Sequence, residues 1–311
     1  MLLAVTGATG FLGRHFVAGA TRAGHRVRAL ALPDERTGAD EQVAGTLEDR
    51  AALRGLVEGA DALVHLAAAG VQSRDRAWDP MISANVTAPV GLVEAASQAG
   101  VARVVAAGTC LEYAGHGRLP EAPWAGAEAR CDEEAPLEAA DPYGATKAAG
   151  GLLLRARARE LKLPCWYLRF ASLYGPGDDV AKFLPGAMDA ALDRRPFDMT
   201  GGEQVREWLH VDDATAALLS AVAKDPGASG AVVNVGTGEG IPLVELVRLV
   251  YRLAGADPAM ARPGVRPYRP GDPHRLVMDA GRASALLGWR ARTTLEAGLA
   301  GALARRKEME H

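Results

Sequence analysis

Tyr143 and Lys147 are the residues whose types and spacing most directly suggest chemistry. They lie four positions apart in the segment Tyr143-Gly144-Ala145-Thr146-Lys147, so an α-helix would place the phenol and the ammonium on one face. Free tyrosine has a pKa of about 10, and lowering it by about three units requires about 4 kcal/mol from a group such as the lysine cation. The spacing therefore predicts an acid/base tyrosine whose pKa is lowered by Lys147, with an ordinary surface pair as the alternative.

Thr109 adds a hydroxyl to this pair. It follows the apolar stretch 101–107, which has the length and composition of a buried strand, so Thr109 would stand at the carboxyl end of that strand. A hydroxyl there would hold the same substrate oxygen with which Tyr143 exchanges a proton. The three residues together suggest proton transfer coupled to hydride transfer.

A glycine-rich turn, Thr6-Gly7-Ala8-Thr9-Gly10-Phe11-Leu12-Gly13, follows the first apolar stretch of the chain. Gly7 permits a tight turn, Gly10 lets the backbone approach a pyrophosphate, and Gly13 allows a helix to pack closely on a strand. The helix that begins here would turn unpaired N–H groups toward negative charge. Glycine also serves turns for steric reasons alone, but the strand–turn–helix order predicts a dinucleotide site.

The sequence leaves the choice between NAD and NADP open. The second expected strand ends at residues 29–32 without an acidic side chain at its tip, where a carboxylate would hold the adenosine ribose hydroxyls. Two acidic residues and Arg36 come just beyond it. Arg14 and Arg28 would bind a 2′-phosphate only if their side chains turn inward.

The apolar pattern indicates the elements that must position these groups. Short apolar stretches alternate with amphipathic stretches of helical period in the first half of the chain. The expected strands cover residues 1–5, 27–32, 60–66, 101–107 and 165–170, and the expected helices cover residues 11–20, 86–98, 141–159, 242–253 and 282–287. This order predicts an α/β fold: a Rossmann-type doubly wound parallel sheet with a smaller C-terminal substrate-binding lobe.

The expected domains follow from the same pattern. Residues 1–170 would form the dinucleotide-binding Rossmann domain, to which the chain returns at about 206–236. Residues 171–205 and 237–311 would form the substrate-binding lobe at the carboxyl edge of the sheet, where doubly wound folds bind ligands. Asp141-Pro142 marks the start of the helix that carries the acid/base pair, because aspartate caps a helix and proline suits its first turn.

Composition excludes several other classes of protein. The chain of 311 residues has 35 basic and 38 acidic residues and no basic stripe, so neither a nucleic acid nor a membrane surface is an expected partner. It has no apolar run of bilayer-spanning length and no basic leader of a signal peptide. Cys110, Cys131 and Cys165 are too widely spaced for a disulfide framework or a metal cluster. We therefore expect a cytoplasmic protein without a metal site.

Several motifs together resemble the extended short-chain dehydrogenase/reductase family of the NAD-dependent epimerase/dehydratase type. They are the glycine turn, the Tyr-x-x-x-Lys helix and the segments 64–68, 85–87, 168–177, 202–206 and 269–272. The resemblance implies that Tyr143 is the acid/base, that Lys147 holds the nicotinamide ribose, and that Thr109 matches the serine or threonine of the family. Its members include nucleotide-sugar epimerases, dehydratases and ketoreductases.

The resemblance also implies two sets of binding residues. The cofactor, NAD or NADP, would contact Gly7, Thr9, Gly10, Phe11, Leu12, Gly13, Leu66, Ala67, Ala68, Asn85, Tyr143, Lys147 and Phe170. The substrate, a nucleoside-diphosphate sugar, would contact Thr109, Ser172, Arg206, Arg269 and Asp272. The two arginines would clasp the diphosphate, because a planar guanidinium matches phosphate oxygens, with surface salt bridging as the alternative.

The sequence departs from the family pattern at several places. Cys110 and Leu111 stand where the 4,6-dehydratases carry Asp-Glu, so dehydration is not expected. Ser172 replaces an asparagine of many relatives, and Trp208 is expected in the core. Between Thr109 and Tyr143 the chain is longer than in the epimerases, and we expect the excess, around Trp124 and Cys131, to shape a lid or a subunit contact.

The favoured function is reduction of a nucleoside-diphosphate 4-keto-sugar by NAD(P)-dependent hydride transfer at a hexose carbon, C4 being favoured. A 4-epimerase is the alternative within the family, and a non-catalytic NADP-binding regulatory protein is the alternative of another class, against which Tyr143 and Lys147 argue. Relatives often pair through the helix that bears Tyr143, so a homodimer is expected. Gly150 and Gly151 in that helix would permit close contact with the partner.

Overall fold

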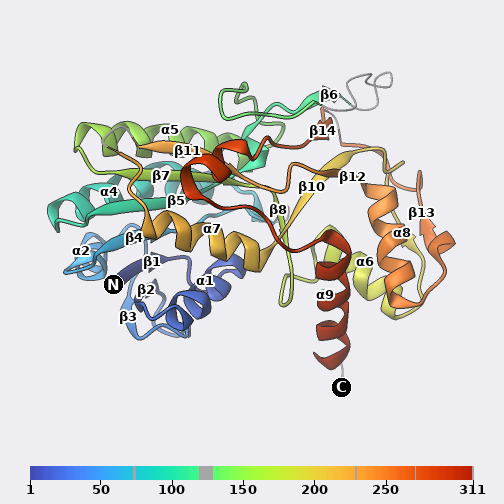
Figure 1. Ribbon diagram of the computed structural model, residues 1–311, viewed down its shortest axis with the longest axis horizontal. Coiled ribbons are helices and arrows are strands. Elements are labelled where there is room, and N and C mark those ends of the chain that lie inside the picture. The colour runs from blue at the N-terminus through green and yellow to red at the C-terminus, as the bar shows by residue number, and fades with distance from the viewer. Residues whose placement is uncertain (73–74, 119–128, 228–229, 270, 310–311) are drawn as a thin grey trace.

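The larger of two main sheets has seven parallel strands. The computed structural model describes residues 1–72, 75–118, 129–227, 230–269 and 271–309. The strands of this sheet are β1 (Leu2–Thr6), β2 (Arg26–Ala31), β3 (Glu41–Ala44), β4 (Ala62–His65), β5 (Arg103–Thr109), β7 (Cys165–Phe170) and β11 (Ala231–Val235). They lie side by side in the order β11-β7-β5-β4-β1-β2-β3 (Figure 1), so the strand order reverses beside β1, as in a doubly wound fold.

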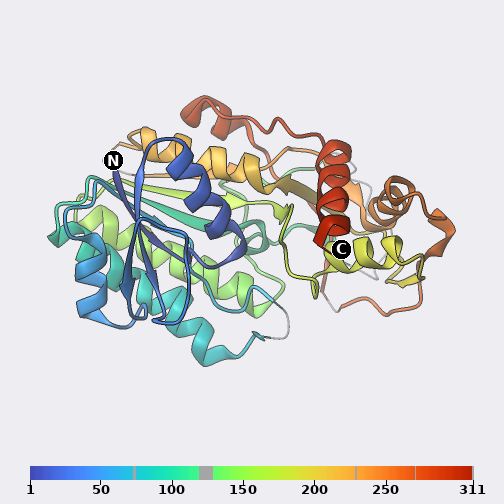
Figure 2. The same cartoon turned by 90° about the horizontal axis from the view of Figure 1, so that it is seen from below.

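Helices cover both faces of this sheet (Figures 1 and 2). One face carries α1 (Phe11–Arg22) and α7 (Val211–Ala223), and the other carries α2 (Arg50–Val57), α4 (Ala88–Gln98) and α5 (Pro142–Glu160). Successive residues of β5 alternate between the two layers: Val105 belongs to the same buried cluster as Phe16 of α1, whereas Val104 and Ala106 belong to the cluster that contains Leu92 of α4. Because the central strands β1, β4 and β7 are buried on both faces, most of their residues are apolar, which is the pattern seen in the sequence.

A second, mixed sheet forms the smaller lobe. It contains β12 (Gly240–Pro242), β10 (Val205–His210), β14 (Pro273–Leu276) and β6 (His116–Arg118), with β8 (Ser172–Tyr174) paired to β10. Around it lie α6 (Phe183–Leu192), α8 (Leu243–Ala254), α9 (Leu295–Met309) and the short strands β9 (Phe197–Asp198) and β13 (Ala261–Arg262). The predicted α/β class with a smaller second lobe is therefore confirmed. The domain boundaries stay a prediction: β11 and α7 belong with the larger sheet, and β10 belongs to the smaller one.

Some elements differ from the sequence expectation in type or extent. The expected helix 86–98 is preceded by α3 (Trp78–Ile82) and a π-helical turn, η2 (Ser83–Thr87), and residues 283–287 form another π-helical turn, η5 (Ala283–Leu287). Two short 3₁₀ turns, η3 (Cys110–Glu112) and η4 (Pro258–Met260), complete the described elements. In the part of the chain that the structure describes, no helix is long and apolar enough to cross a bilayer.

The described ends of the long segment between Thr109 and Tyr143 join the smaller lobe. β6 pairs antiparallel with β14, and Cys131 forms an isolated parallel bridge with Met278. These contacts add the segment to the second sheet. The composition of the segment predicted a loop, whereas the structure contains the strand β6 there. Trp124 lies outside the described residues.

The expected role of Gly150 and Gly151 in a subunit contact is wrong. A Cβ at Gly150 would lie 1.7 Å from the carbonyl oxygen of Asn85, and a Cβ at Gly151 would lie 2.4 Å from the ring of Tyr167. Both glycines therefore face the interior and let α5 approach η2 and β7. The neighbouring Leu152 and Leu153 are about half exposed on α5.

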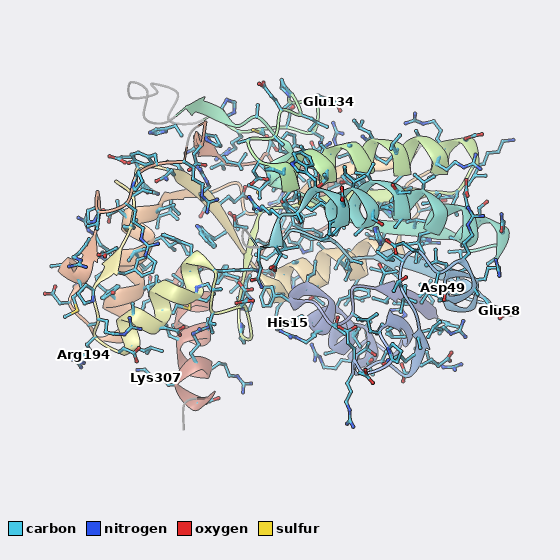
Figure 3. The ribbon with its side chains drawn as sticks, turned by 180° about the vertical axis from the view of Figure 1, so that it is seen from behind. His15, Asp49, Glu58, Glu134, Arg194 and Lys307 are labelled. Atoms are coloured by element: carbon cyan, nitrogen blue, oxygen red, sulfur yellow. The ribbon has the colours of Figure 1, made fainter. Side chains whose placement is uncertain are left out.

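The two lobes meet along α1. His15, labelled in Figure 3, donates from its Nε2 atom to the carbonyl oxygen of Pro176 at 3.0 Å. Arg14 donates to the carbonyl oxygen of Gly177 at 2.9 Å. These bonds connect the first helix of the larger sheet to the segment after β8, and the cleft between the lobes lies next to them.

Candidate active site

A cleft with a volume of about 590 Å³ lies at the carboxyl ends of β1, β4, β5 and β7. Most of the predicted site residues line it: Gly7, Thr9, Gly10, Phe11, Leu12, Gly13, Leu66, Ala67, Ala68, Thr109, Tyr143, Lys147, Phe170 and Ser172. The structure thus brings together residues that come from five separate regions of the chain. Four predicted residues do not line the cleft: Asn85, Arg206, Arg269 and Asp272.

The glycine turn between β1 and α1 forms a cradle without side chains. Gly7 has a positive φ of 75°, and a Cβ there would lie 2.5 Å from the backbone nitrogen of Ala67. A Cβ at Gly13 would lie 1.9 Å from the carbonyl oxygen of Gly7, so only glycine lets the helix approach so closely. Gly10 caps α1 without a side-chain hydrogen bond, which leaves the first N–H groups of the helix available to a pyrophosphate. The cradle therefore fits a dinucleotide.

Thr109 stands at the end of β5 and begins the 3₁₀ turn η3. Its Oγ1 accepts from the backbone nitrogen of Leu111 at 3.3 Å, and its own backbone nitrogen donates to Oε1 of Glu112 at 2.8 Å. Because Oγ1 acts as an acceptor within the turn, its proton can be donated to a substrate oxygen in the cleft. The turn thus presents the hydroxyl with a defined direction.

Tyr143 and Lys147 lie in the first two turns of α5, as predicted. Asp141 caps this helix by accepting from the backbone nitrogen of Gly144 at 2.8 Å. The same carboxylate pairs with Arg76 at 2.9 Å, and that guanidinium lies 5.9 Å from the centre of the Tyr143 ring. The cap therefore fixes the helix start that places both side chains in the cleft.

The expected lowering of the Tyr143 pKa is wrong for the protein alone. Burial raises this pKa above its ordinary value, with Glu112, Cys110 and Asp141 acting in the same direction and Arg76 against them. Lys147 is itself buried, and burial lowers its pKa. Desolvation disfavours both the tyrosinate of Tyr143 and the ammonium of Lys147. This effect outweighs the attraction between those two charges that their helical spacing suggested. At pH 7 the Tyr143 phenol is therefore protonated and able to donate a proton.

Asn85 lies behind the wall of the cleft. Its side chain accepts from the backbone nitrogen of Ala69 at 2.9 Å and donates to the carbonyl oxygen of Ala69 at 2.9 Å and to Oγ1 of Thr146 at 3.0 Å. These bonds fasten the segment after β4 to α5. In this structure Asn85 supports the residues that line the cleft without lining it.

The two predicted substrate arginines differ in their surroundings, and their binding of a substrate stays a prediction. Arg206 is largely buried, pairs with Asp272 at 2.8 Å and donates to the carbonyl oxygens of Val205 and Pro273 at 2.9 Å. Arg269 is exposed, and its carbonyl oxygen accepts from the backbone nitrogen of Asp272 at 3.2 Å. A buried guanidinium requires an internal carboxylate, and the sequence motif did not reveal that Asp272 supplies it.

The tip of β2 carries a carboxylate after all. Oε2 of Glu35 accepts from the backbone nitrogen of Leu32 at 3.0 Å, and the backbone nitrogen of Glu35 donates to the carbonyl oxygen of Leu32 at 3.0 Å. This turn folds Glu35 back onto the residue that follows the strand. The expectation that no carboxylate lies at the strand tip is therefore wrong.

The two arginines considered for a 2′-phosphate are engaged elsewhere. Nε of Arg28 lies 2.6 Å from Oε2 of Glu41, and its Nη1 donates to the carbonyl oxygen of Glu58 at 2.6 Å. Arg14 donates to Gly177, as described above. Neither side chain is therefore placed to bind the 2′-phosphate of NADP at the tip of β2.

Sequence reasoning missed several residues that line the cleft. Trp208 was expected in the core, but it forms part of the cleft wall. Lys182 pairs with Asp178 at 2.7 Å, and its Nζ lies 5.3 Å from the centre of the Phe11 ring. This cation is far from the glycine turn in sequence, so spacing carries no signal for it. Among the described residues, no group of three histidine, cysteine or acidic side chains could hold a metal ion.

Comparisons with known proteins agree with this geometry. The sequence profile described as NAD dependent epimerase/dehydratase family matches residues 3–236. The UDP-glucose 4-epimerase of Mycolicibacterium smegmatis is 32% identical, with 95% of each chain covered, and the dTDP-glucose 4,6-dehydratase of the same organism is 31% identical, with 96% of this chain and 91% of that one covered.

Solved structures are similar over almost the whole chain. MoeE5 in complex with UDP-glucose and NAD has 31% identity and a TM-score of 0.87, covering 100% of this chain and 99% of that chain. DesIV, a dTDP-glucose 4,6-dehydratase from Streptomyces venezuelae with NAD bound, has 29% identity and a TM-score of 0.85, covering 99% and 97%. The profile match spans more than two thirds of the sequence, and the chain belongs to the NAD-dependent epimerase/dehydratase family of nucleotide-sugar enzymes.

Proposed function

We propose that this protein is an NAD-dependent nucleoside-diphosphate-4-keto-sugar reductase. The observation that carries the proposal is the buried, protonated phenol of Tyr143 in the same cleft as the Thr109 hydroxyl. Reduction of a ketone needs a proton donor at its oxygen, and a neutral phenol is such a donor.

The chain's own residues divide the work. The glycine turn and the cleft wall would hold NADH, whose chemistry when bound would be hydride donation to the carbonyl carbon. Tyr143 gives its proton to the carbonyl oxygen, and Thr109 donates a hydrogen bond to the same oxygen and orients it. Lys147 holds the ribose hydroxyls of the cofactor, and the N-terminus of α1, bounded by Gly10, faces the pyrophosphate.

NAD rather than NADP is the proposed cofactor. Doubly wound folds bind the adenosine ribose at the tip of the second strand, where an acidic side chain accepts from the hydroxyls. Glu35 lies at this tip. Its carboxylate would repel a 2′-phosphate, and Arg14 and Arg28 are engaged elsewhere. MoeE5 and DesIV both bind NAD, in agreement with this choice.

A nucleoside-diphosphate hexose is the proposed substrate, with C4 as the reacting carbon. Similar proteins are named for UDP- and dTDP-sugars, and MoeE5 binds UDP-glucose and UDP-glucuronic acid. The exposed Arg269 is the proposed partner of the diphosphate. Arg206 and Asp272 would hold the turn that presents Arg269, and Ser172 would contact the substrate from β8.

A 4-epimerase is the second candidate, favoured by the 32% identity to a UDP-glucose 4-epimerase over 95% of both chains. Dehydration is not proposed despite the dehydratase relatives. Cys110 and Leu111 line the cleft where those enzymes carry carboxyl groups, and the adjacent Glu112 is buried in an ion pair with Arg169. Membership of an enzyme family argues against the third alternative, a non-catalytic NADP-binding regulatory protein.

A homodimer is proposed through the outer face of α5. Leu152 and Leu153 expose about half of their surface there, where a monomer would leave apolar surface in water.

Absorbance of NADH at 340 nm distinguishes the candidates. Net loss with a 4-keto-6-deoxyhexose nucleotide indicates a reductase. Interconversion of UDP-glucose and UDP-galactose without net loss indicates an epimerase. Tyr143→Phe is the control that must abolish either reaction. No reaction with a panel of both substrate types would overturn the proposal.

A further inference from the structure

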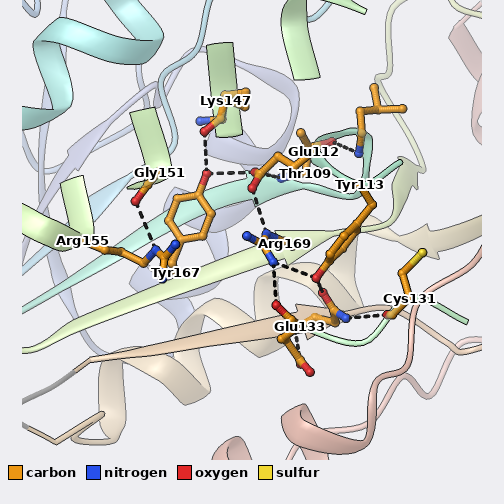
Figure 4. A network of polar contacts seen from close by, with 12 residues as sticks. Thr109, Glu112, Tyr113, Cys131, Glu133, Lys147, Gly151, Arg155, Tyr167 and Arg169 are labelled. Carbon is orange, nitrogen blue, oxygen red and sulfur yellow. Dashed lines mark hydrogen bonds and ion pairs between the residues drawn. The ribbon is translucent and has the colours of Figure 1, made fainter. Parts of the chain in front are cut away.

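Glu112 is a fully buried carboxylate directly beneath Thr109 (Figure 4). Its Oε1 accepts from the backbone nitrogen of Thr109 at 2.8 Å and from the hydroxyl of Tyr167 at 2.9 Å. Its Oε2 accepts from Nε of Arg169 at 2.8 Å, and the Arg169 side chain is only 2% exposed. Both oxygens are thus hydrogen-bonded, and the charge is compensated without solvent.

This carboxylate is connected to each element that carries the proposed chemistry. It holds the Thr109 backbone itself. The Tyr167 hydroxyl that contacts Glu112 also lies 3.1 Å from the carbonyl oxygen of Lys147 on α5. A shift of Glu112 would therefore move the turn that aims the Thr109 hydroxyl and loosen the contact between β7 and the Lys147 segment.

Stability alone is a weak reason for such a pair. Replacing a buried ion pair by well-packed apolar residues is often neutral or stabilising, because desolvation of two charges offsets their attraction. The pair of Glu112 with Arg169 is also surrounded by further polar groups: Arg169 donates to the hydroxyl of Tyr113 at 2.8 Å. A costly charge directly behind the cleft points to a role in the site.

The charge of Glu112 acts on both titratable groups of α5. It raises the pKa of Tyr143 and that of Lys147, in the second case against the effect of burial. The other charged or titratable groups that face Tyr143 are Cys110 of η3, Asp141 at the start of α5, Arg76 before α3, Tyr167 of β7 and Lys147 itself. Glu112 is the only fully buried carboxylate among these described groups.

We propose that Glu112 is a positioning residue of this site: it fixes the turn that aims the Thr109 hydroxyl, and it places a carboxylate close to the Tyr143 phenol. The inference rests on the proposed reductase function.

Two substitutions separate the charge from the geometry. Glu112→Gln keeps the length and one acceptor oxygen but removes the charge. Glu112→Asp keeps the charge but shortens its reach to Thr109. Glu133→Gln is the matched control, because the Glu133 side chain is 4% exposed, accepts from the backbone nitrogen of Asn234 at 2.8 Å and belongs to the same network without touching Thr109.

The first readout is the titration of Tyr143 in the full-length protein, followed as tyrosinate absorbance near 295 nm with each Tyr143→Phe variant as the blank. Glu112→Gln should lower the midpoint by about one pH unit or more. Glu112→Asp and Glu133→Gln should leave it near that of the parent protein. An unchanged midpoint in Glu112→Gln would overturn the electrostatic part. This measurement needs no turnover, so it stands even if the proposed substrate fails.

The second readout is steady-state reduction. Glu112→Asp should lower kcat about tenfold or more with little change in KM, and Glu112→Gln should move the alkaline limb of kcat to lower pH. Parent-like kcat in Glu112→Asp would overturn the positioning part. If Glu112→Gln does not fold, Glu112→Gln/Arg169→Met removes both charges. A smaller lowering of the midpoint is expected there, because the Arg169 cation that opposes the Glu112 charge is removed with it.

Discussion

Replacing Glu35 by glutamine should change the cofactor preference of the protein. The carboxylate is half-buried and held at the tip of β2 by its bond to the backbone nitrogen of Leu32. A hydrogen bond from a ribose hydroxyl to a carboxylate contributes about 1.5–3 kcal/mol. Loss of about 2 kcal/mol raises the Kd for NAD about 30-fold. Removal of the negative charge also relieves repulsion of about 1 kcal/mol or more against a 2′-phosphate, so the Kd for NADP should fall.

Calorimetric titration with each oxidised dinucleotide measures this change without any sugar substrate. Asp34→Asn is the matched control, because the neighbouring Asp34 is exposed and its substitution removes the same charge from the surface. It should leave the ratio of the two Kd values within about twofold of the parent ratio. If Glu35→Gln changes this ratio no more than Asp34→Asn does, Glu35 does not read the ribose and the NAD assignment loses its structural basis.

Three further outcomes follow from the cleft. Tyr143→Phe should lower kcat by about 10²–10⁴-fold, measured as NADH loss, with the Kd for NAD nearly unchanged; equal activity would contradict its role as proton donor. In the parent protein, reduction requires the protonated phenol of Tyr143, and burial raises the pKa of that phenol. We therefore expect kcat to stay constant through pH 8 and to fall only above about pH 10, the ordinary tyrosine pKa. A fall of kcat near pH 7 in a pH–rate profile would show that bound cofactor reverses this shift. Gly13→Ala should abolish detectable NAD binding in the same calorimetric titration, because its Cβ would lie 1.9 Å from the carbonyl oxygen of Gly7, whereas Gly91→Ala, with open space around its Cβ, should bind normally.

Local rules predicted the parts of the fold that depend on neighbouring residues. The expected strand 165–170 is β7 to the residue, because a strand buried on both faces of a parallel sheet is mainly apolar, with Arg169 as the charged exception. Asp141-Pro142 located the start of α5, because a cap and a first-turn proline act within three residues. The glycine turn could likewise be predicted from residues that are adjacent in the sequence. The resemblance to a family then supplied the partners of Tyr143 across the chain.

Long-range contacts explain what the sequence could not show. Lys182, the residue before α6, reaches Phe11 because the smaller lobe meets the larger one beside the start of α1. The engagement of Arg206 with Asp272 depends on the pairing of β10 with β14. Neither contact has a spacing rule, because a loop or a whole element separates the partners.

The sign of the Tyr143 pKa shift is the most instructive failure. Helical spacing reveals Lys147, a cation, but says nothing about how deeply the phenol is buried or which anion lies behind it. Glu112 comes from the turn after β5, where Arg169 of β7 pairs with it. The protonation state of the acid/base is thus set by three elements, α5, η3 and β7, of which the Tyr-x-x-x-Lys motif contains only one. If Glu112→Gln lowers the titration midpoint, this tertiary contribution is measured directly, and the motif alone is insufficient to assign the direction of proton transfer.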